Sequence, residues 1–359
     1  MTSRLAVRLT IHGGWTLPAT AASQPQKSVS SDSQIRADVA VIVPCHNVVS
    51  YLQRALDSVF AQTYRDFHIY AVNDGSTDST AQVLEANASR CTFVSQPQFG
   101  PAAARNRAIH LSESPFIAFL DADDEWLPEK LECQIALMMQ DRTLGLVCSA
   151  CFVSEPGGDT RVISAPKSVP GSGKLFGELA RNCFVFTPTV VVRRRCLEEV
   201  GYFTESLAVS EDFNLWLRIA AKWNIACLPE ALAITHKRSG SLSESISPAE
   251  RLKNGIAALE FVQSSCPQLS PAEAQALHHA LAERFYFYGS FLLHSGAKES
   301  SRPELATALK LRPAYWKALL KLLLSFLPTP AIAFLMAISR KLSGRFSRQP
   351  NQLKPQDVF

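Results

Sequence analysis

The chain has 359 residues, enough for more than one folding unit, and a formal net charge of +4 from 36 Lys and Arg against 32 Asp and Glu. Its nine cysteines are an odd number without framework spacing, which excludes a disulfide scaffold and is typical of buried thiols in a reducing compartment. Basic and aromatic residues are not interleaved on a nucleic-acid fold, so we expect no nucleic-acid partner.

Shifts in composition divide the chain into four parts: residues 1–37, 38–247, 248–312 and 313–359. The first part is rich in Ser, Thr, Ala and Gln, has Asp32 as its one acid, and lacks the apolar core of a signal peptide. We expect this N-terminal segment to be disordered. Two origins remain open for it, a targeting segment and an overlong gene start.

Strands and helices are predicted to alternate from residue 39 onward. An apolar run over 39–43 ends in Pro44-Cys-His-Asn47, and a second over 67–72 ends in Asn73-Asp74-Gly75. Gly100-Pro101 then opens a helix that carries Arg105. This order is typical of a doubly wound parallel sheet.

The next strand, within residues 115–124, leads directly into Asp121, Asp123 and Asp124. In open α/β sheets, ligands bind beyond the carboxyl ends of the strands. Crowded carboxylates repel one another unless a cation neutralises them, and oxygen ligands select Mg²⁺ or Mn²⁺, which commonly share their coordination with substrate phosphates. The sequence therefore predicts a metal-assisted nucleotide or phosphate site.

A later helix begins at Ser210-Glu-Asp-Phe213. The helix dipole favours acids at this end, so capping alone would account for the two carboxylates. The alternative is that one of them is the general base for an attacking hydroxyl.

Five segments together resemble family 2 glycosyltransferases in order and spacing: VIVPCHN, VNDGSTDST, GPAAARNRAI, FLDADDEWLPEKL and SEDFNLWLRIA, within roughly residues 38–245. The resemblance implies a GT-A fold, an α/β, Rossmann-like and mostly parallel sheet flanked by helices, followed here by an α-helical C-terminal extension. Haloacid-dehalogenase phosphatases also carry a strand-borne acidic motif. They place Thr or Val two positions after the second Asp of the motif. This chain has Glu125 there, so the phosphatases are the weaker match.

For the donor nucleotide, the resemblance places Pro44 and Asn47 beneath the base and makes Asp74 the acceptor of a hydrogen bond from it, commonly from uracil. A charged acceptor makes the stronger hydrogen bond. Arg105 would brace Asp74 or the nucleotide. The alternatives are an Asx turn at Asp74 before Gly75 and a plain surface arginine at 105.

The resemblance further implies that Asp121 contacts the ribose, while Asp123 holds the Mn²⁺ or Mg²⁺ that bridges the diphosphate. Relatives commonly carry an Arg and then a His shortly before Gly-Ser-x-Ser. Here His236 stands where the Arg is common, and Arg238 stands where the His would be. Either side chain could reach the diphosphate, and an exposed basic loop is the alternative.

By the same resemblance, Asp212 is the base of an inverting single displacement, and Glu211 orients acceptor or base. The implied function is transfer of a sugar from a nucleotide-diphosphate sugar, with UDP-sugars favoured, to a glycan or lipid-linked acceptor. Two other functions stay open, a catalytically silent nucleotide- or glycan-binding protein and a nucleotidyltransferase on a similar sheet.

Residues 248–312 are predicted to form a helical hairpin, with apolar side chains at spacings of three and four. These are Leu277, Leu281, Phe285, Tyr288 and Leu292. The hairpin is expected to pack on the catalytic domain, because a single helical pair cannot form a solenoid.

The tail, 313–359, is predicted to associate with an anionic membrane surface. Residues 310–359 hold nine Lys or Arg and one acid, Asp357. The apolar stretches 316–327 and 331–338 are each shorter than the roughly 20 residues of a membrane span, whereas a basic amphipathic helix lies in the interface. We therefore expect a peripheral protein on the cytoplasmic face of the cell membrane. The alternatives are a helix packed on the core and a re-entrant hairpin.

Overall fold

The computed structural model describes residues 38–155, 157, 159–165, 169, 171–238 and 245–328. The predictions for residues 1–37, for Gly-Ser-x-Ser at 240–243 and for the apolar stretch 331–338 lie outside the described residues.

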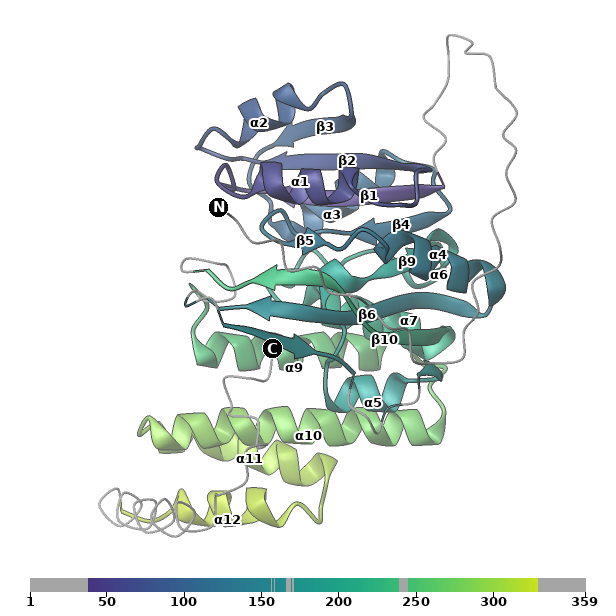
Figure 1. The fold of residues 1–359 in the computed structure, drawn as a ribbon. Helices are drawn as coiled ribbons and strands as arrows, with labels where there is room; N and C mark the ends of the chain where they lie inside the picture. Colours follow the sequence, from purple (N-terminus) through teal and green to yellow (C-terminus); the bar gives the residue numbers. More distant parts are fainter. Residues whose placement is uncertain are drawn as a thin grey trace. The chain divides into compact units, whose positions relative to one another are not determined.

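The strands form one sheet (Figure 1). They are β1 (Val39–Cys45), β2 (Phe67–Asp74), β3 (Cys91–Gln96), β4 (Phe116–Phe119), β5 (Glu125–Trp126), β6 (Leu144–Ser154), β7 (Thr160–Ile163), β8 (Ser172–Gly173), β9 (Val191–Arg193) and β10 (Asn224–His236). Their order is β3-β2-β1-β4-β9-β6-β10-β5, with β7 on β6 and β8 on β10.

The longer strands share one direction. β1 pairs in parallel with β2 and β4, β2 with β3, and β6 with β10. β9 is antiparallel to both β4 and β6, so it joins the two parallel groups without reversing them. The predicted α/β architecture with a mostly parallel sheet is confirmed. The ends of β1, β2 and β4 therefore meet at one edge, where the acidic residues were expected.

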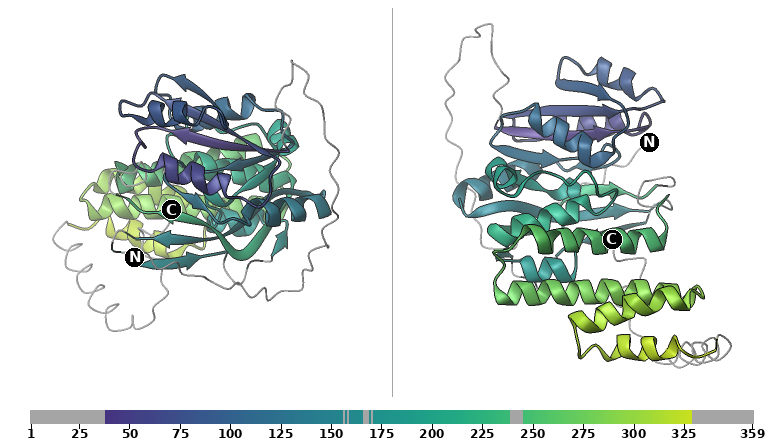
Figure 2. Two further views of the ribbon diagram at one scale, coloured as in Figure 1. Left: turned by 45° about the horizontal axis from the view of Figure 1, so that its top comes forward. Right: turned by 180° about the vertical axis from the view of Figure 1, so that it is seen from behind.

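Helices cover both faces of the sheet (Figure 2). One face packs against α1 (Leu52–Phe60), α2 (Thr80–Ala86) and α4 (Lys130–Gln140). The other packs against α3 (Pro101–His110), α5 (Phe176–Arg181), α6 (Arg194–Val200) and α7 (Glu211–Lys222). Successive residues of β1 alternate between the two cores, because strand side chains point to opposite faces. This burial on both faces explains the continuous apolar sequence of β1.

The C-terminal extension contains more helices than the predicted hairpin. Residues 248–312 hold α9 (Pro248–Ser265), α10 (Pro271–His294) and α11 (Lys298–Leu311), and α12 (Trp316–Leu324) follows. The hairpin prediction missed a break between α9 and α10. Ser270 accepts a hydrogen bond from the Glu273 amide, and the Glu273 carboxylate accepts one from the Ser270 amide, so a capping box starts a separate helix at Pro271.

The extension packs on the catalytic helices, as expected. α9 contacts α7, and α10 contacts both α9 and α5. Asn214 of α7 is fully buried and donates to the carbonyl of Ala258 on α9 at 2.9 Å. Buried residues of α9 and α10 belong to the same cluster as those of α7 and the sheet. The extension and the catalytic fold therefore share one core.

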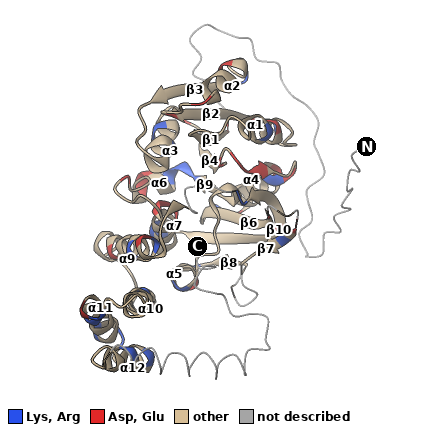
Figure 3. Ribbon diagram, turned by 90° about the vertical axis from the view of Figure 1, so that its left-hand side faces the viewer, with Lys and Arg blue, Asp and Glu red and all other residues tan. Residues whose placement is uncertain are grey.

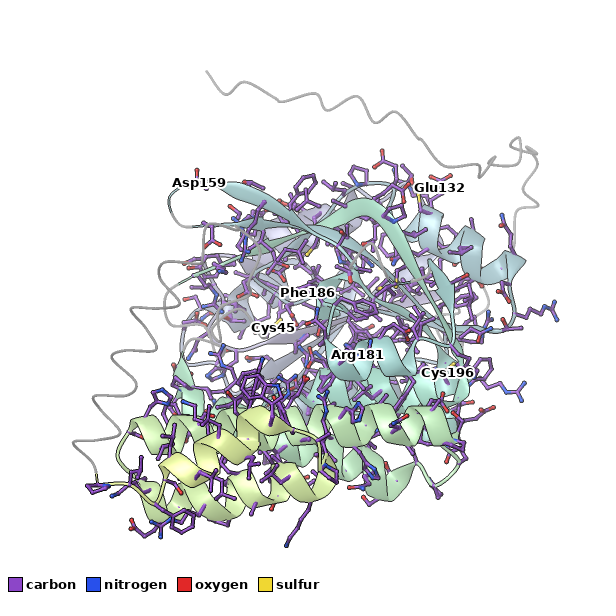
Figure 4. All side chains as sticks on the ribbon, turned by 90° about the horizontal axis from the view of Figure 1, so that it is seen from below. Cys45, Glu132, Asp159, Arg181, Phe186 and Cys196 are labelled. Carbon is purple, nitrogen blue, oxygen red and sulfur yellow. The ribbon has the colours of Figure 1, made fainter. Side chains whose placement is uncertain are left out.

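All nine cysteines are free thiols. Cys148 and Cys151 of β6 belong to the cores on opposite faces of the sheet, as their spacing in a strand predicts. Cys45 and Cys196 lie well apart in Figure 4. Because Cys148 and Cys151 belong to opposite cores, the C-x-x-C sequence is not a paired thiol site.

Candidate active site

The turn after β1 is tied to the turn after β2. Asn47 has a left-handed backbone with φ of 51°, and its Oδ1 accepts the amide of Thr77 at 2.8 Å. His46 Nδ1 lies 2.8 Å from the carbonyl oxygen of Asp74. Pro44 precedes this turn opposite Val72 in the parallel register. The structure thus brings Pro44, Asn47 and the end of β2 together.

Asp74 is buried and anchors the loop that leads into α3. Its Oδ1 accepts from Gln96 Nε2 at 2.7 Å and from the Phe99 amide at 2.9 Å, while Oδ2 accepts from the Gly100 amide at 2.8 Å. Gly100 has φ of 93°, a conformation that suits glycine. An ionised carboxylate has about four lone-pair sites, so one acceptor position remains beside these three hydrogen bonds.

Arg105 is a buried bridge between two carboxylates, and its predicted contact with Asp74 is not the one it makes. Its Nη2 lies 2.7 Å from Asp121 Oδ1 and its Nη1 lies 2.7 Å from Glu211 Oε1. The side chains of Arg105 and Glu211 are 6% and 9% exposed, so the surface-arginine alternative is excluded. Asp74 binds the loop before α3 instead. The bridge connects the end of β4 to the first residue of α7.

Asp123, the predicted metal ligand, forms an ion pair with Arg238. Arg238 Nε lies 2.6 Å from Asp123 Oδ2, and both side chains are about one-fifth exposed. The Arg238 guanidinium also lies over the ring of Tyr51, 4.9 Å from its centre. Arg238, which stands where relatives commonly have a His, thus contacts the acidic loop after β4 and does not belong to a detached basic loop.

A second set of contacts joins this loop to the end of β10. His236 Nε2 lies 2.7 Å from Glu125 Oε1, and Arg54 Nε lies 3.0 Å from the same oxygen. Asp124 Oδ1 accepts the backbone amide of His236 at 3.0 Å. Asp124 binds β10 because the β5–β10 pairing brings His236 beside the acidic loop.

Asp212 follows Glu211 at the start of α7 and is partly exposed. Its Oδ2 accepts the hydroxyl of Thr187 at 2.9 Å, and Thr187 belongs to the 3₁₀ turn η1 (Thr187–Thr189). The residue before the helix, Ser210, has φ of 64°, a left-handed conformation that is costly for a residue with a Cβ and is often found at functional sites. This departure from ordinary helix capping favours a functional role for the segment.

A further contact joins β5, the strand that follows the acidic loop, to η1. Trp126 of β5 is buried and donates its Nε1 hydrogen to the carbonyl of Pro188 at 2.8 Å. The acidic loop is therefore connected to the start of α7 by two routes, through Arg105 to Glu211 and through η1 to Asp212.

The carboxylates of the site influence one another. Burial raises the pKa of Asp124 well above its ordinary value, and the charges of Asp121 and Asp123 add to this effect. Burial likewise raises the pKa of Asp121, against the opposing effect of Arg105. For Glu211, burial and the neighbouring Asp212 raise the pKa from 4.5 to about 7, although Arg105 acts in the opposite direction. Each of these three carboxyl groups therefore holds its proton more tightly than an exposed carboxyl does.

These residues fit a divalent cation that a substrate completes. No cluster of three or more His, Cys, Asp or Glu side chains is arranged to hold an ion within the described ranges. A Mg²⁺-type ion needs only one or two carboxylates when phosphate oxygens and water supply the rest. Asp123 is partly exposed, and the mutual repulsion around it favours a cation. Arg238 is the cation beside it in this structure.

Three residues of the site escaped the sequence analysis: Thr187, Arg54 and Tyr51. Thr187 is far from Asp212 in sequence, and only the fold brings its hydroxyl there. Tyr51 and Arg54 lie at the start of α1, three positions apart and so on one face of the helix. No motif marks these two residues, but their spacing of three positions just after the Asn47 turn is a weak sequence signal that they lie near the site.

Two hollows elsewhere, of about 630 and 530 Å³, lie along α10 and are lined by residues remote in sequence from the acidic loop. They contribute nothing to the site described above.

The raised pKa of Glu211 predicts a pH-dependent stability. Between about pH 4.5 and 7 the folded protein holds a proton that the unfolded chain has released. The free energy of unfolding therefore falls as pH rises through this window, by at most about 1.4 kcal/mol per pH unit for this group. Urea unfolding across the window should show a steeper fall for the wild type than for Glu211→Gln.

The matched control is Glu198→Gln, which alters an exposed carboxylate of α6. It should retain the wild-type pH dependence. Parallel curves for wild type and Glu211→Gln would contradict the assigned titration.

Comparisons with known proteins identify the family of the chain. The profile of glycosyl transferase family 2 matches residues 40–201, which include the acidic loop and end before Glu211. An Escherichia coli protein, the UDP-Glc:alpha-D-GlcNAc-diphosphoundecaprenol beta-1,3-glucosyltransferase WfgD, is 31% identical over 196 residues, 53% of this chain and 72% of WfgD. An uncharacterized glycosyltransferase of Rickettsia felis is 31% identical over 197 residues, 54% of this chain and 32% of that relative. This chain thus spans about a third of the Rickettsia protein's length.

Solved structures with the same fold include S. aureus TarS 1–349 in complex with UDP-GlcNAc, with a TM-score of 0.62 and 21% identity over 88% of this chain and 94% of that chain. The Pyrobaculum calidifontis mannosyltransferase PcManGT in complex with GDP-Man and Mn²⁺ has a TM-score of 0.54 and 18% identity over 88% of each chain. At these identities the likeness shows the fold alone, which is GT-A. Together with the sequence match, it establishes that the chain belongs to glycosyl transferase family 2.

Proposed function

We propose that the protein is an inverting glycosyltransferase that moves a sugar from a nucleotide-diphosphate sugar to a glycan or a lipid-linked acceptor. The observation that carries this proposal is the Arg105 bridge, in which one guanidinium lies 2.7 Å from both Asp121 and Glu211. The bridge brings the donor-side carboxylates and the acceptor-side carboxylate Asp212 into one site.

In the proposed reaction, Asp212 Oδ1 or Oδ2 takes the proton of the acceptor hydroxyl. The hydroxyl oxygen then forms a bond to the anomeric carbon, while the bond from that carbon to the diphosphate oxygen breaks. The nucleoside diphosphate leaves with the electron pair of that bond, so the anomeric configuration inverts. The Thr187 hydroxyl orients the Asp212 carboxylate through its 2.9 Å hydrogen bond, and Glu211 is held in place by Arg105.

On the donor side, Pro44 and Asn47 would lie under the base, and the remaining acceptor position of Asp74 would take a base N–H. Asp121 would bind the ribose. Asp123 would hold Mn²⁺ or Mg²⁺, which when bound supplies positive charge to the leaving diphosphate. Arg238 would then be free of Asp123 and would pair with the diphosphate, since a guanidinium binds phosphate oxygens well.

The names of similar proteins support this assignment. WfgD is named for a UDP-Glc donor and a diphosphoundecaprenol-linked acceptor, TarS was solved with UDP-GlcNAc, and PcManGT with GDP-Man and Mn²⁺. We favour a UDP-sugar donor. We also place the reaction at the cytoplasmic face of the cell membrane, where a lipid-linked acceptor would be available to a peripheral enzyme.

A catalytically silent nucleotide or glycan binder is the second candidate. The observation that favours it is the ion pair between Arg238 and Asp123, because this cation stands at the proposed metal ligand. The experiments below separate the two functions.

The donor site predicts a nucleotide-specific and metal-dependent stabilisation. We expect UDP with Mn²⁺ to raise the thermal midpoint more than GDP, dTDP or CDP, because a ligand that binds only the folded state stabilises it, by about 2.7 kcal/mol at a hundredfold excess over Kd. Asp123→Ala should abolish the metal-dependent part. The control Asp159→Ala, on an exposed loop, should retain it. No shift with any nucleotide would overturn the transferase proposal.

The proposed base predicts a separation of binding from turnover. Asp212→Ala and Asp212→Asn should lower transfer about 10²- to 10⁴-fold, the usual contribution of a general base. UDP binding should stay within about twofold of wild type, because Asp212 lies on the acceptor side in this proposal. Unchanged transfer would remove Asp212 as the base. Equal and complete inactivity of wild type and variants, with UDP binding intact, would favour the silent binder.

The pairing of Arg238 with Asp123 predicts competition between arginine and metal. Arg238→Gln should strengthen Mn²⁺ binding without nucleotide about fivefold, since a partly exposed ion pair contributes up to about 1 kcal/mol. It should also weaken UDP binding in the presence of Mn²⁺. Electron paramagnetic resonance of free Mn²⁺ measures the first effect.

The matched control is Lys237→Gln, because Lys237 pairs instead with Glu155 at 3.0 Å. Its Mn²⁺ affinity should equal that of the wild type. Equal affinity in Arg238→Gln as well would show that this arginine does not compete with the ion.

A further inference from the structure

Helix α12 exposes an apolar face. Trp316, Leu323 and Phe326 are 65%, 58% and 64% exposed. Leu319, Leu320 and Leu327 are exposed beside them. These six residues are called the α12 face. Trp316, Leu319, Leu320 and Leu323 lie on α12 at spacings of three and four positions and so form one stripe, and Phe326 and Leu327 follow in the turn after the helix. Few other large apolar side chains are exposed in the described part of the chain, and none of them forms such a run.

The opposite side of α12 carries small side chains toward the extension. Ala318 is buried in a cluster with Ala282, Ala308 and Tyr315 from the neighbouring segments. Ser325 is also buried, and its carbonyl accepts a hydrogen bond from Arg302 of α11 at 3.0 Å. The helix is thus held with its large apolar residues outward, the reverse of the arrangement that burial on the protein would favour.

The charge of α12 and of the chain that follows it is positive. Residues 316–328 contain Lys317 and Lys321 and no acid. Lys298 and Arg302 of α11 reach the turn that follows α12, where Lys298 Nζ lies 3.2 Å from the carbonyl of Leu327. Figure 3 marks the Lys and Arg positions along α11 and α12 in blue. The chain after α12 adds five further Lys and Arg and one acid, Asp357. Residues 310–359 hold nine basic residues in all, and the other four, Lys310, Arg312, Lys317 and Lys321, lie before or within α12.

This charge distribution distinguishes the possible occupants of the face. A second copy would present the same surface about a twofold axis, so lysines would meet lysines without an acid from residues 316–328 to balance them. An anionic lipid surface instead complements both properties, since its acyl region accepts the apolar residues and its headgroups attract the cations. None of the described helices is long and apolar enough to cross a bilayer.

We propose that the α12 face is the part of this protein that lies in an anionic lipid surface. The inference deepens the proposed membrane location and rests on it, but not on the transfer chemistry. Trp316 and the leucines enter the interface, while Lys317 and Lys321 flank it from the side of the helix. Because α12 packs on α11, and α11 on α10, the contact also sets how the catalytic fold is held at the membrane.

Sedimentation of the full chain with vesicles tests the proposal. Binding to phosphatidylcholine vesicles containing about one-third phosphatidylglycerol should exceed binding to pure phosphatidylcholine at least tenfold, because each basic residue near the surface adds about 1 kcal/mol. Leu320→Glu combined with Leu323→Glu should reduce this binding at least tenfold. The matched control is Met139→Glu on α4, an exposed apolar residue outside the α12 face, and it should bind as wild type.

Tryptophan fluorescence locates the contact. Of the five tryptophans, Trp126 and Trp216 are buried, Trp223 is half-buried, Trp316 is exposed, and Trp15 lies outside the described residues. We expect anionic vesicles to shift the emission of the wild type to shorter wavelength mainly through Trp316, and the comparison with Trp316→Phe isolates its part. Trp316→Phe should remove most of that shift and keep most of the sedimentation. An unchanged shift in this variant would place the lipid contact elsewhere and overturn the proposal.

Three results would each refute the lipid contact of the α12 face, and the first two would identify another occupant. Absent vesicle binding together with a dimer that Leu323→Glu dissociates, measured by light scattering, would assign the face to a second copy. Absent vesicle binding with a lower thermal midpoint in Leu323→Glu would assign it to the chain's own segment 331–338. Equal binding of wild type and the double variant would place the membrane contact outside α12. UDP-dependent stabilisation, measured in parallel, reports on the donor site independently of all three.

Discussion

The Arg105 bridge is the interaction on which the site depends. Asp121 ends one strand of the parallel group and Glu211 begins α7, and these elements are ninety residues apart in sequence. A buried arginine between them satisfies two carboxylates that would otherwise repel each other, and breaking such a pair typically costs about 3–5 kcal/mol. The same contact determines where Asp212 lies, because it is the next residue of the helix. Stability and the proposed chemistry are thus coupled through one side chain, and a substitution at Arg105 would affect both at once.

Charge compensation is the second theme of the site. The loop after β4 places Asp121, Asp123 and Asp124 at one edge of the sheet, and a different hydrogen-bond donor of the protein binds each of them. Arg105 binds Asp121, Arg238 binds Asp123, and the His236 amide binds Asp124. Of these three, only the pair at Asp123 is both ionic and partly exposed on both sides. In our proposal it is therefore the pair that a metal and a diphosphate replace at least cost. In the same proposal, Arg238, which stands where relatives commonly have a His, neutralises Asp123 until the donor binds.

The C-terminal helices connect this site to the α12 face. Asn214 lies on the helix that carries Asp212, and its hydrogen bond to Ala258 ties that helix to α9. From α9 the packing continues through α10 and α11 to α12. The helices follow one another away from the sheet in Figure 1. In our proposal this arrangement holds the acceptor side of the catalytic fold in a defined relation to the lipid surface, without a membrane-spanning segment among the described residues.

The sequence by itself determined the local features of this protein. The apolar run of β1 and the acid-rich end of the 115–124 strand predicted a mostly parallel α/β fold and the site at its edge, because burial on both faces and strand-end acids leave patterns within a few residues. The resemblance added the family. Only the tertiary structure decided the partners: Arg105 with Glu211 rather than Asp74, Asp124 with β10, Thr187 beside Asp212, and Arg238 on Asp123. These contacts join residues up to 115 positions apart. No short pattern encodes them, because they depend on how the sheet orders its strands and on which loops that order brings together.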